Sequence, residues 1–319
     1  MAAFAARIDR DLIRQWMPMI TLVALALIVG TVTPQFLTVD SLLVLAADTA
    51  TLFILATGVT FVIMLGGIDL SIQSMASLSS VLIALSVSRF GYGSILLAVG
   101  AGALSGFLAG VAHVKLRIPS FIATLAVGGV LAGTALVISG ARSITLGEAE
   151  RGYLGWVSGY SLGVPHEVFI GIVVLVLAHV VQSRTRFGRY SAAIGAGEAA
   201  AYASGVKVDR TKILALTLSG ALAAFAGVIL AGRLSSGSPT LANELLLPAI
   251  AAVVVGGTAI TGGIGSIWRT AIGALIISVV RIGMTFVGVD IFAQQIVFGV
   301  VLILAVAITI DRSKIPIVK

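Results

Sequence analysis

Apolar segments alternate with short polar or glycine-containing breaks along the whole chain. Many segments are close to 20 residues long, about the length that an α-helix needs to cross the hydrocarbon core of a bilayer. Cutting the sequence at its polar, glycine and proline positions predicts about ten membrane-spanning helices. We therefore expect an all-α, polytopic helical membrane protein in which glycine or proline breaks some helices. The predicted spans cover residues 17–37, 41–65, 71–88, 93–113, 119–139, 167–182, 213–232, 245–261, 266–286 and 291–310.

The composition agrees with a membrane protein. Of the 319 residues, 59% are hydrophobic and 10% are charged, and the mean hydropathy is +1.14. The first apolar run follows Arg7, Arg10 and Arg14, as in a signal peptide, but it continues into "TVTPQFL" instead of a small-residue cleavage site. We therefore expect this run to be retained as the first helix. The chain has no cysteine, which excludes disulfides and thiolate metal sites.

The distribution of basic residues predicts the orientation. With both termini in the cytoplasm, the cytoplasmic segments hold 15 of the lysines and arginines and the outer loops hold 4, in agreement with the positive-inside rule. The outer residues are Arg89, Arg142, Arg151 and Arg233, while Arg281 falls within a span. The net charge of +7 therefore reflects membrane topology, and no basic patch interleaved with aromatic residues indicates nucleic-acid binding. We expect one transmembrane domain, 1–319, with cytoplasmic segments at 1–16, 183–212 and 311–319.

Glycine is abundant, with 37 residues, and it recurs at four-residue spacing in two spans. Gly102, Gly106 and Gly110 share one helical face, and Gly129 and Gly133 do the same in the next span. Small residues at this spacing allow helix backbones to approach closely in lipid. Both faces are therefore predicted to pack against neighbouring helices.

The stretch "GGIDLS" at 66–71 places a carboxylate between two long apolar runs. Gly66 and Gly67 are suited to end one helix, and Asp69 or Ser71 can then cap the next one at the cytoplasmic boundary. Acids inside a membrane are also typical of cation or substrate sites, which leaves a functional alternative for Asp69. A second glycine-rich break at 253–266 echoes this stretch and hints at duplicated halves, as in many transporters.

Polar residues inside the predicted spans are the candidate solute contacts. The segment "LAADTAT" contributes Asp48, Thr49 and Thr51 to the outer half of the second span. A carboxylate accepts hydrogen bonds from a polyol well, so Asp48 is predicted to line a solute pathway. Two alternatives are a structural ion pair with Arg281 and a position at the outer interface.

Weaker pathway candidates lie in two other spans. Thr124 lies in the fifth span, and Gln294 and Gln295 lie near the outer end of the last one. Paired amides are as often contacts between helices as contacts with a ligand. His113, His166 and His179 do not have metal-ligand spacing. No nucleophile constellation is present, so neither a metal site nor a catalytic residue is expected.

Six blocks of sequence, in order along nearly the whole chain, resemble the ribose-type permeases of ABC importers. The blocks are "GGIDLS" at 66–71, "IPSFIATLA" at 118–126, "TRFGRY" at 185–190, "AIGAGEAAAYASGVKV" at 193–208, "AGVILAGRLSSGSPT" at 226–240 and "AIAAVVVGGTAITGGIGS" at 249–266. The resemblance implies a subunit of the bacterial inner membrane that imports a small polar solute, a monosaccharide or polyol. It also implies three partners: a cytoplasmic ATPase, a second permease copy or paralogue, and an extracytoplasmic solute-binding protein. The sequence contains no "GxxxxGK[ST]" phosphate loop, so we expect no cofactor on this chain and ATP on the partner subunit.

The cytoplasmic segment 183–212 is the predicted coupling loop to the ATPase. It carries six basic residues around "GEAAAYASG", an alanine-rich stretch that predicts a short helix ended by a glycine. The positive-inside rule alone would also explain the basic residues. The resemblance implies that this helix contacts the ATPase through Glu198, Ala199, Ala200, Ser204 and Gly205.

Two other functional classes remain open at this level. An ion-coupled secondary transporter would use the intramembrane acids Asp48 and Asp69, and its uptake would depend on an ion gradient instead of an ATPase. A passive channel or an intramembrane enzyme has little support from the residues. The sequence therefore favours the permease subunit of a binding-protein-dependent ABC importer.

Overall fold

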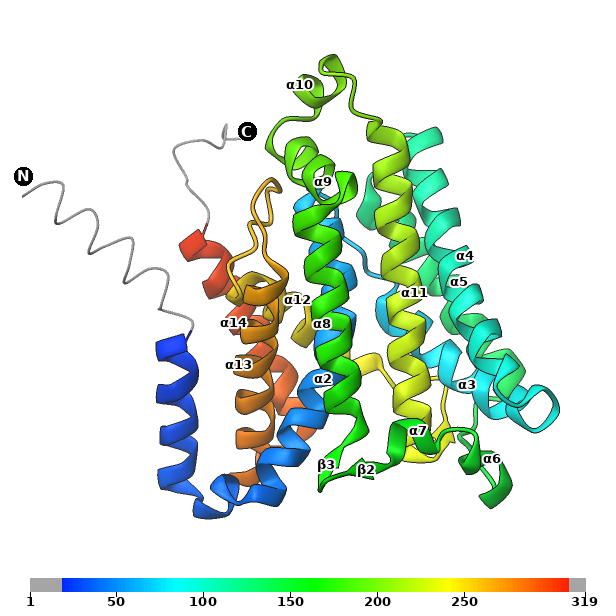
Figure 1. Cartoon of the computed structure of the whole chain (residues 1–319), viewed down its shortest axis with the longest axis vertical. Helices are drawn as coiled ribbons and strands as arrows, with labels where there is room; N and C mark the ends of the chain where they lie inside the picture. Colours follow the sequence, from blue (N-terminus) through cyan, green and yellow to red (C-terminus); the bar gives the residue numbers. More distant parts are fainter. Residues whose placement is uncertain (1–18, 310–319) are drawn as a thin grey trace, which may run out of the picture.

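The computed structural model describes residues 19–309, and nearly all regular structure in this range is α-helical (Figure 1). Within this range, six helices are long and apolar enough to cross a membrane. They are α2 (Val39–Met64), α4 (Gly93–Lys115), α5 (Ser120–Ser139), α8 (His166–Arg184), α11 (Val208–Leu234) and α13 (Ile267–Phe286). Further apolar helices are Met19–Val32, α12 (Leu246–Val255) and α14 (Ile291–Thr309). The chain is therefore an all-α polytopic membrane protein.

Each predicted span overlaps a helix, but two spans end earlier than expected. The helix predicted over 17–37 ends at Val32, because Pro34 begins a separate 3₁₀ turn, η1 (Pro34–Leu37). The helix predicted over 245–261 ends at Val255, where Gly257 adopts a φ of +87°. The predicted cytoplasmic segments 1–16 and 311–319 lie outside the described residues.

The helix α3 (Ile72–Phe90) is less apolar than the six long helices and lies inside the bundle. Its buried serines bind the irregular chain between α11 and α12, which contains the 3₁₀ turn η2 (Asn243–Leu245). The hydroxyl of Ser77 accepts a hydrogen bond from the main-chain N–H of Ala242 at 3.0 Å, and Ser80 accepts one from Ser238 at 3.1 Å. Irregular backbone at membrane depth needs such partners because lipid supplies none.

The centre of the bundle is formed by α2 and α11, which are largely covered by other helices. One glycine face of α4 packs directly on α11, as predicted, and a Cβ atom at Gly106 would overlap the main-chain oxygen of Leu216. The glycines at this contact are Gly102, Gly106 and Gly110. Gly129 and Gly133 have no atom within 4 Å of a Cβ position, so the predicted packing of this second face is wrong within the described chain.

Short elements mark the two ends of the bundle (Figure 1). One end carries α9 (Arg186–Ala196) and α10 (Glu198–Ala203) and is called the α10 end below. The opposite end carries a β-hairpin and is called the hairpin end. Its elements are α6 (Glu148–Gly152), α7 (Gly155–Ser158) and the antiparallel pair β2 (Tyr160–Ser161) and β3 (Val164–Pro165). A second antiparallel pair joins β1 (Ile144–Thr145) to β4 (Ser236–Gly237), with Ile144 opposite Gly237.

Candidate functional site

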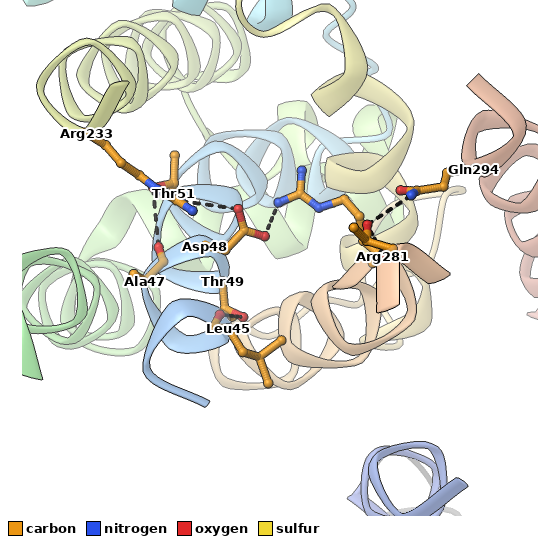
Figure 2. Close-up of polar contacts among 9 residues, drawn as sticks. Leu45, Ala47, Asp48, Thr49, Thr51, Arg233, Arg281 and Gln294 are labelled. Atoms are coloured by element: carbon orange, nitrogen blue, oxygen red, sulfur yellow. Dashed lines mark hydrogen bonds and ion pairs between the residues drawn. The ribbon is translucent and has the colours of Figure 1, made fainter. Parts of the chain in front are cut away.

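A charged cluster joins three helices in the hairpin half of the bundle (Figure 2). One carboxylate oxygen of Asp48 on α2 lies 3.2 Å from a guanidinium nitrogen of Arg233 on α11. The other oxygen accepts a hydrogen bond from Arg281 on α13. The three side chains are 15%, 27% and 21% exposed, respectively, so their mutual attraction is only partly screened by water. We call these residues the Asp48 cluster.

The Asp48 cluster contains one partner that the sequence predicted and one that it did not. The ion pair between Asp48 and Arg281 is present. Arg233 was assigned to an outer loop, but it lies in the last turn of α11, which extends to Leu234 instead of ending at residue 232. A basic residue in that turn also interacts favourably with the helix dipole. The correction moves a third charge into the bundle.

The two threonines beside Asp48 donate hydrogen bonds to their own helix. The hydroxyl of Thr49 donates to the main-chain oxygen of Leu45 at 2.7 Å, and that of Thr51 donates to Ala47 at 3.5 Å. Both side chains are buried, and Thr49 lines an apolar cavity of about 210 Å³. Their predicted contact with solute stays a prediction, and the present geometry gives their hydroxyls a local role.

The predicted glutamines of α14 contact neighbouring elements. The amide of Gln294 donates to the hydroxyl of Thr285, in the last turn of α13, at 3.1 Å. Figure 2 shows this glutamine near Arg281. The amide of Gln295 donates to the main-chain oxygen of Glu244 at 3.2 Å and also contacts its carboxylate. These bonds agree with the alternative in which paired amides hold helices together.

A polar cavity of about 330 Å³ opens beside the Asp48 cluster at the hairpin end. Its polar lining consists of Asp40, Ser158, Tyr160, Glu167 and Arg233. Glu167 is only 5% exposed and lines this cavity together with Arg233. Glu167 was missed from the sequence, although an acid two residues after Pro165, at the start of an apolar span, was a usable signal.

The "GGIDLS" turn closes α2 in the way the glycines predict. Gly66 has a φ of +79°, its N–H donates to Ile63, and the N–H of Gly67 donates to Val62, which together form a Schellman motif. The carboxylate of Asp69 accepts from both the N–H and the hydroxyl of Ser71, at 2.9 and 2.6 Å. Ser71 is the residue before α3, and its own side chain caps no N–H group.

Asp69, expected to cap a helix at the cytoplasmic boundary, is buried, with 1% exposure. The reason is that residues after Gly67 turn inward and dock on α5, where Ser120 accepts from the N–H of Ile68 and Thr124 accepts from the N–H of Leu70, each at 3.0 Å. The second carboxylate oxygen of Asp69 has no hydrogen-bond partner among the described residues. Thr124 therefore positions this turn.

The α10 helix stands at the extreme end of the bundle (Figure 1). Glu198 begins it and forms an ion pair with Lys212 at 2.7 Å, while Gly205, with a φ of +78°, follows its C-cap Ser204. Ala199 and Ala200 are exposed, as predicted for a docking face. Tyr202 is 73% exposed on the same short helix and was not singled out from the sequence. A cavity of about 290 Å³ lies between this helix and the "GGIDLS" turn.

Comparison with known proteins assigns the chain to a family. The sequence profile of the family described as "Branched-chain amino acid transport system / permease component" matches residues 41–306. The chain belongs to this family. The permease is 39% identical over 300 residues to the ribose import permease protein RbsC of Escherichia coli (strain K12), covering 93% of both chains. No solved structure matches the permease.

Other relatives confirm the resemblance to sugar permeases. RbsC of Bacillus subtilis (strain 168) is 40% identical over 299 residues, which is 93% of the permease and 92% of the relative. The fructose import permease protein FrcC of Rhizobium meliloti is 33% identical over 299 residues, covering 91% and 82% of the two chains. The chain is therefore an ABC-importer permease and a multi-pass protein of the bacterial inner membrane.

Proposed function

We propose that this permease is the membrane subunit of a binding-protein-dependent ABC importer that carries a monosaccharide or polyol inward. The observation that carries the proposal is the similarity, over nearly the full length, to permeases named for ribose and fructose import. The family description refers to branched-chain amino acids. We give the sugar relatives more weight because they are 33–40% identical over 91–93% of the chain.

The proposed topology has about ten spans, with both termini and the α10 end in the cytoplasm and one transmembrane domain over 1–319. The basic side chains of the α10 end support this orientation. They include Lys115, Arg117, Arg184, Arg186, Arg189, Lys207, Arg210 and Lys212. The hairpin end would then face the solute-binding protein, which delivers solute from outside.

The segment 183–212 is proposed to couple the permease to a cytoplasmic ATPase. The exposed positions Ala199, Ala200 and Tyr202 form a short, protruding face that suits a cleft on a partner. Ser204 and Gly205 end the helix, and Glu198 fixes its start to Lys212. ATP is proposed to bind the partner subunit, because the chain contains no phosphate-loop sequence. A second permease copy or paralogue completes the proposed complex.

We place the outer contact with solute in the polar cavity beside the Asp48 cluster. Glu167 supplies a hydrogen-bond acceptor, and Arg233 supplies donors, a combination that suits the hydroxyls of a polyol. The carboxylates of Asp48 and Glu167 balance the charges of Arg233 and Arg281. A neutral solute therefore fits better than an ion. Both carboxylate oxygens of Asp48 are already paired with arginines, so this acid gives no support to ion-coupled transport.

Reconstitution tests the proposed function. The permease is incorporated into liposomes with its ATPase, and uptake of radiolabelled D-ribose, D-fructose and L-leucine is measured with and without the binding protein. We expect sugar uptake that requires ATP and the binding protein, persists when ionophores collapse ion gradients, and is absent with the permease alone. Uptake driven by an ion gradient without the ATPase would contradict the proposal, and transport of leucine alone would contradict the solute class.

A further inference from the structure

The end of α9 meets two segments that are distant in sequence, the turn after α2 and the turn after α12, through direct main-chain contacts. A Cβ atom at Gly195, in the last turn of α9, would overlap the main-chain oxygen of Met64 and the nitrogen of Gly263. The N–H of Gly263 donates to that same oxygen of Met64 at 2.9 Å. A Cβ atom at Gly262 would lie 2.8 Å from the nitrogen of Gly66. We call Gly66, Gly195, Gly262 and Gly263 the glycine contact.

Side chains of α8 and α9 bind the other two segments. Gln182, near the end of α8, donates to the main-chain oxygen of Gly265 at 2.9 Å and accepts from the N–H of Ile267 at 3.0 Å. It therefore binds the loop before α13 and the first residue of α13. The ring of Phe187 on α9 lies 5.3 Å from that of Phe61 on α2. Together these contacts bind α9 to α2 and the preceding helix α8 to the start of α13.

The segments that α9 touches are turns, whereas α9 itself is helical. Gly66, Gly262 and Gly263 have φ values of +79°, +87° and +81°, a region that L-residues with side chains rarely adopt. Such turns are suited to absorb the change in backbone angles when helices move. No flexible side chain separates them from Gly195, so a displacement of α9 reaches both turns directly.

We propose that Gly195 is a positioning residue for transport: through its main-chain contacts, it passes movement of α10 to the turns that end α2 and α12. The inference rests on the proposed docking of the ATPase at α10. Only Gly197 separates α9 from α10, so movement of α10 is passed directly to α9. The turn after α2 leads to Asp69 and the buried start of α3, and the turn after α12 leads to α13. ATP-driven movement at one surface helix thereby changes two interior helices together.

A matched pair of alanine substitutions tests this role. Gly195→Ala adds a methyl group inside the contact, whereas Gly197→Ala adds one where the nearest atom is 3.9 Å away and the φ of 176° suits any residue. In the reconstituted complex, we expect Gly195→Ala to keep the ATPase bound. It should raise the ATP hydrolysed per solute imported by roughly tenfold, because packed contacts switch instead of deforming smoothly. Gly197→Ala should keep the wild-type ratio.

A second pair of alanine substitutions tests the glycine contact from the turn after α12. Gly263→Ala and Gly257→Ala impose similar backbone strain, because their φ values are +81° and +87°. A Cβ atom at Gly263 would lie 3.0 Å from Ala196, but at Gly257 the nearest atom is 4.0 Å away, on Arg269. Both variants should lose some stability through this strain. Only Gly263→Ala is expected to raise the ratio of ATP hydrolysed to solute imported.

Two results would overturn the inference. One is a wild-type ratio of ATP to solute, per assembled complex, in both Gly195→Ala and Gly263→Ala. The other is a lower amount of complex in these variants with a normal ratio in what remains, which would make the contact purely structural. A wild-type complex without ATP-driven uptake is a different result, because it contradicts the proposed function itself and removes the basis of the inference.

Discussion

The Asp48 cluster and the glycine contact connect distant segments of the permease by opposite means. In the cluster, two arginines reach Asp48 across 185 and 233 residues of sequence. Long charged side chains of this kind can follow small helix movements while their ion pairs persist. In the glycine contact, main chains touch without side chains between them, so little movement is absorbed. Ion pairs therefore connect the helices in the hairpin half, and close main-chain packing (shape) connects the segments in the α10 half.

Removing charge should have its largest effect at the Asp48 cluster. Asp48→Ala leaves two partly buried guanidinium groups unpaired, so the free energy of unfolding should fall by about 3 kcal/mol, the low end for breaking a buried pair. Adding Arg281→Met should recover part of this loss, because only Arg233 then lacks its partner. Thermal unfolding in detergent and the yield of folded protein measure both effects.

The control variant for Asp48→Ala is Asp40→Ala, which removes an exposed acid from the first turn of the same helix. It should change the free energy of unfolding by less than about 1 kcal/mol. Equal stability of Asp48→Ala and the wild type would show that the cluster does not hold the hairpin half. Normal folding combined with lost uptake would instead support contact between Asp48 and solute.

Adding a methyl group should be harmful wherever main chains touch, as they do between α4 and α11. Gly106→Ala should lower the free energy of unfolding by about 1–3 kcal/mol, because the new atom overlaps Leu216. The matched variant Gly129→Ala, on α5, points into open space and should be neutral or slightly stabilising. Chemical denaturation of the two variants side by side is the measurement, and similar losses in both would contradict a role for shape.

The acid inside the α10 half should act through its hydrogen bonds to Ser71. Asp69→Asn retains an acceptor and should be mild, whereas Asp69→Leu should cost about 1 kcal/mol of stability. Folded yield and sugar uptake are measured for both variants. An Asn variant that folds normally but transports nothing would replace this structural account with a functional role for the charge.

The smallest effect is expected for the charge pair on α10. Glu198 is 57% exposed in its pair with Lys212, so Glu198→Gln should change the free energy of unfolding by less than about 0.5 kcal/mol. The melting temperature should also depend little on added salt. A larger loss would show that charge, as well as shape, holds the α10 half together.

The helices were predictable because lipid imposes a long apolar pattern on each of them. Contacts between individual residues were less predictable. Arg233 was missed because a boundary error of two residues decided whether it lay in a loop or in α11. Asp69 was expected to be a cap at the cytoplasmic boundary, and nothing local showed that Ser120 and Thr124 draw its turn inward.

The glycine contact illustrates the same limit. The sequence related the breaks at 66–71 and 253–266 as an echo, and the structure shows that their glycines touch. Gly195 had no local signal for joining them, because a glycine near a helix end usually serves only as a stop. Contacts between main chains leave no pattern of residue types beyond glycine itself. The proposed duplication of the two halves stays a prediction.

The account depends most directly on α10 as the point where ATP hydrolysis acts on the permease. The decisive measurement is co-purification of the ATPase with Ala200→Trp, compared with Arg186→Trp at the exposed start of α9. A bulky ring on the α10 face should reduce the bound ATPase about tenfold or more, as expected for a central interface position, and abolish uptake. Arg186→Trp should leave both unchanged. Normal ATPase binding and uptake in Ala200→Trp would contradict the account.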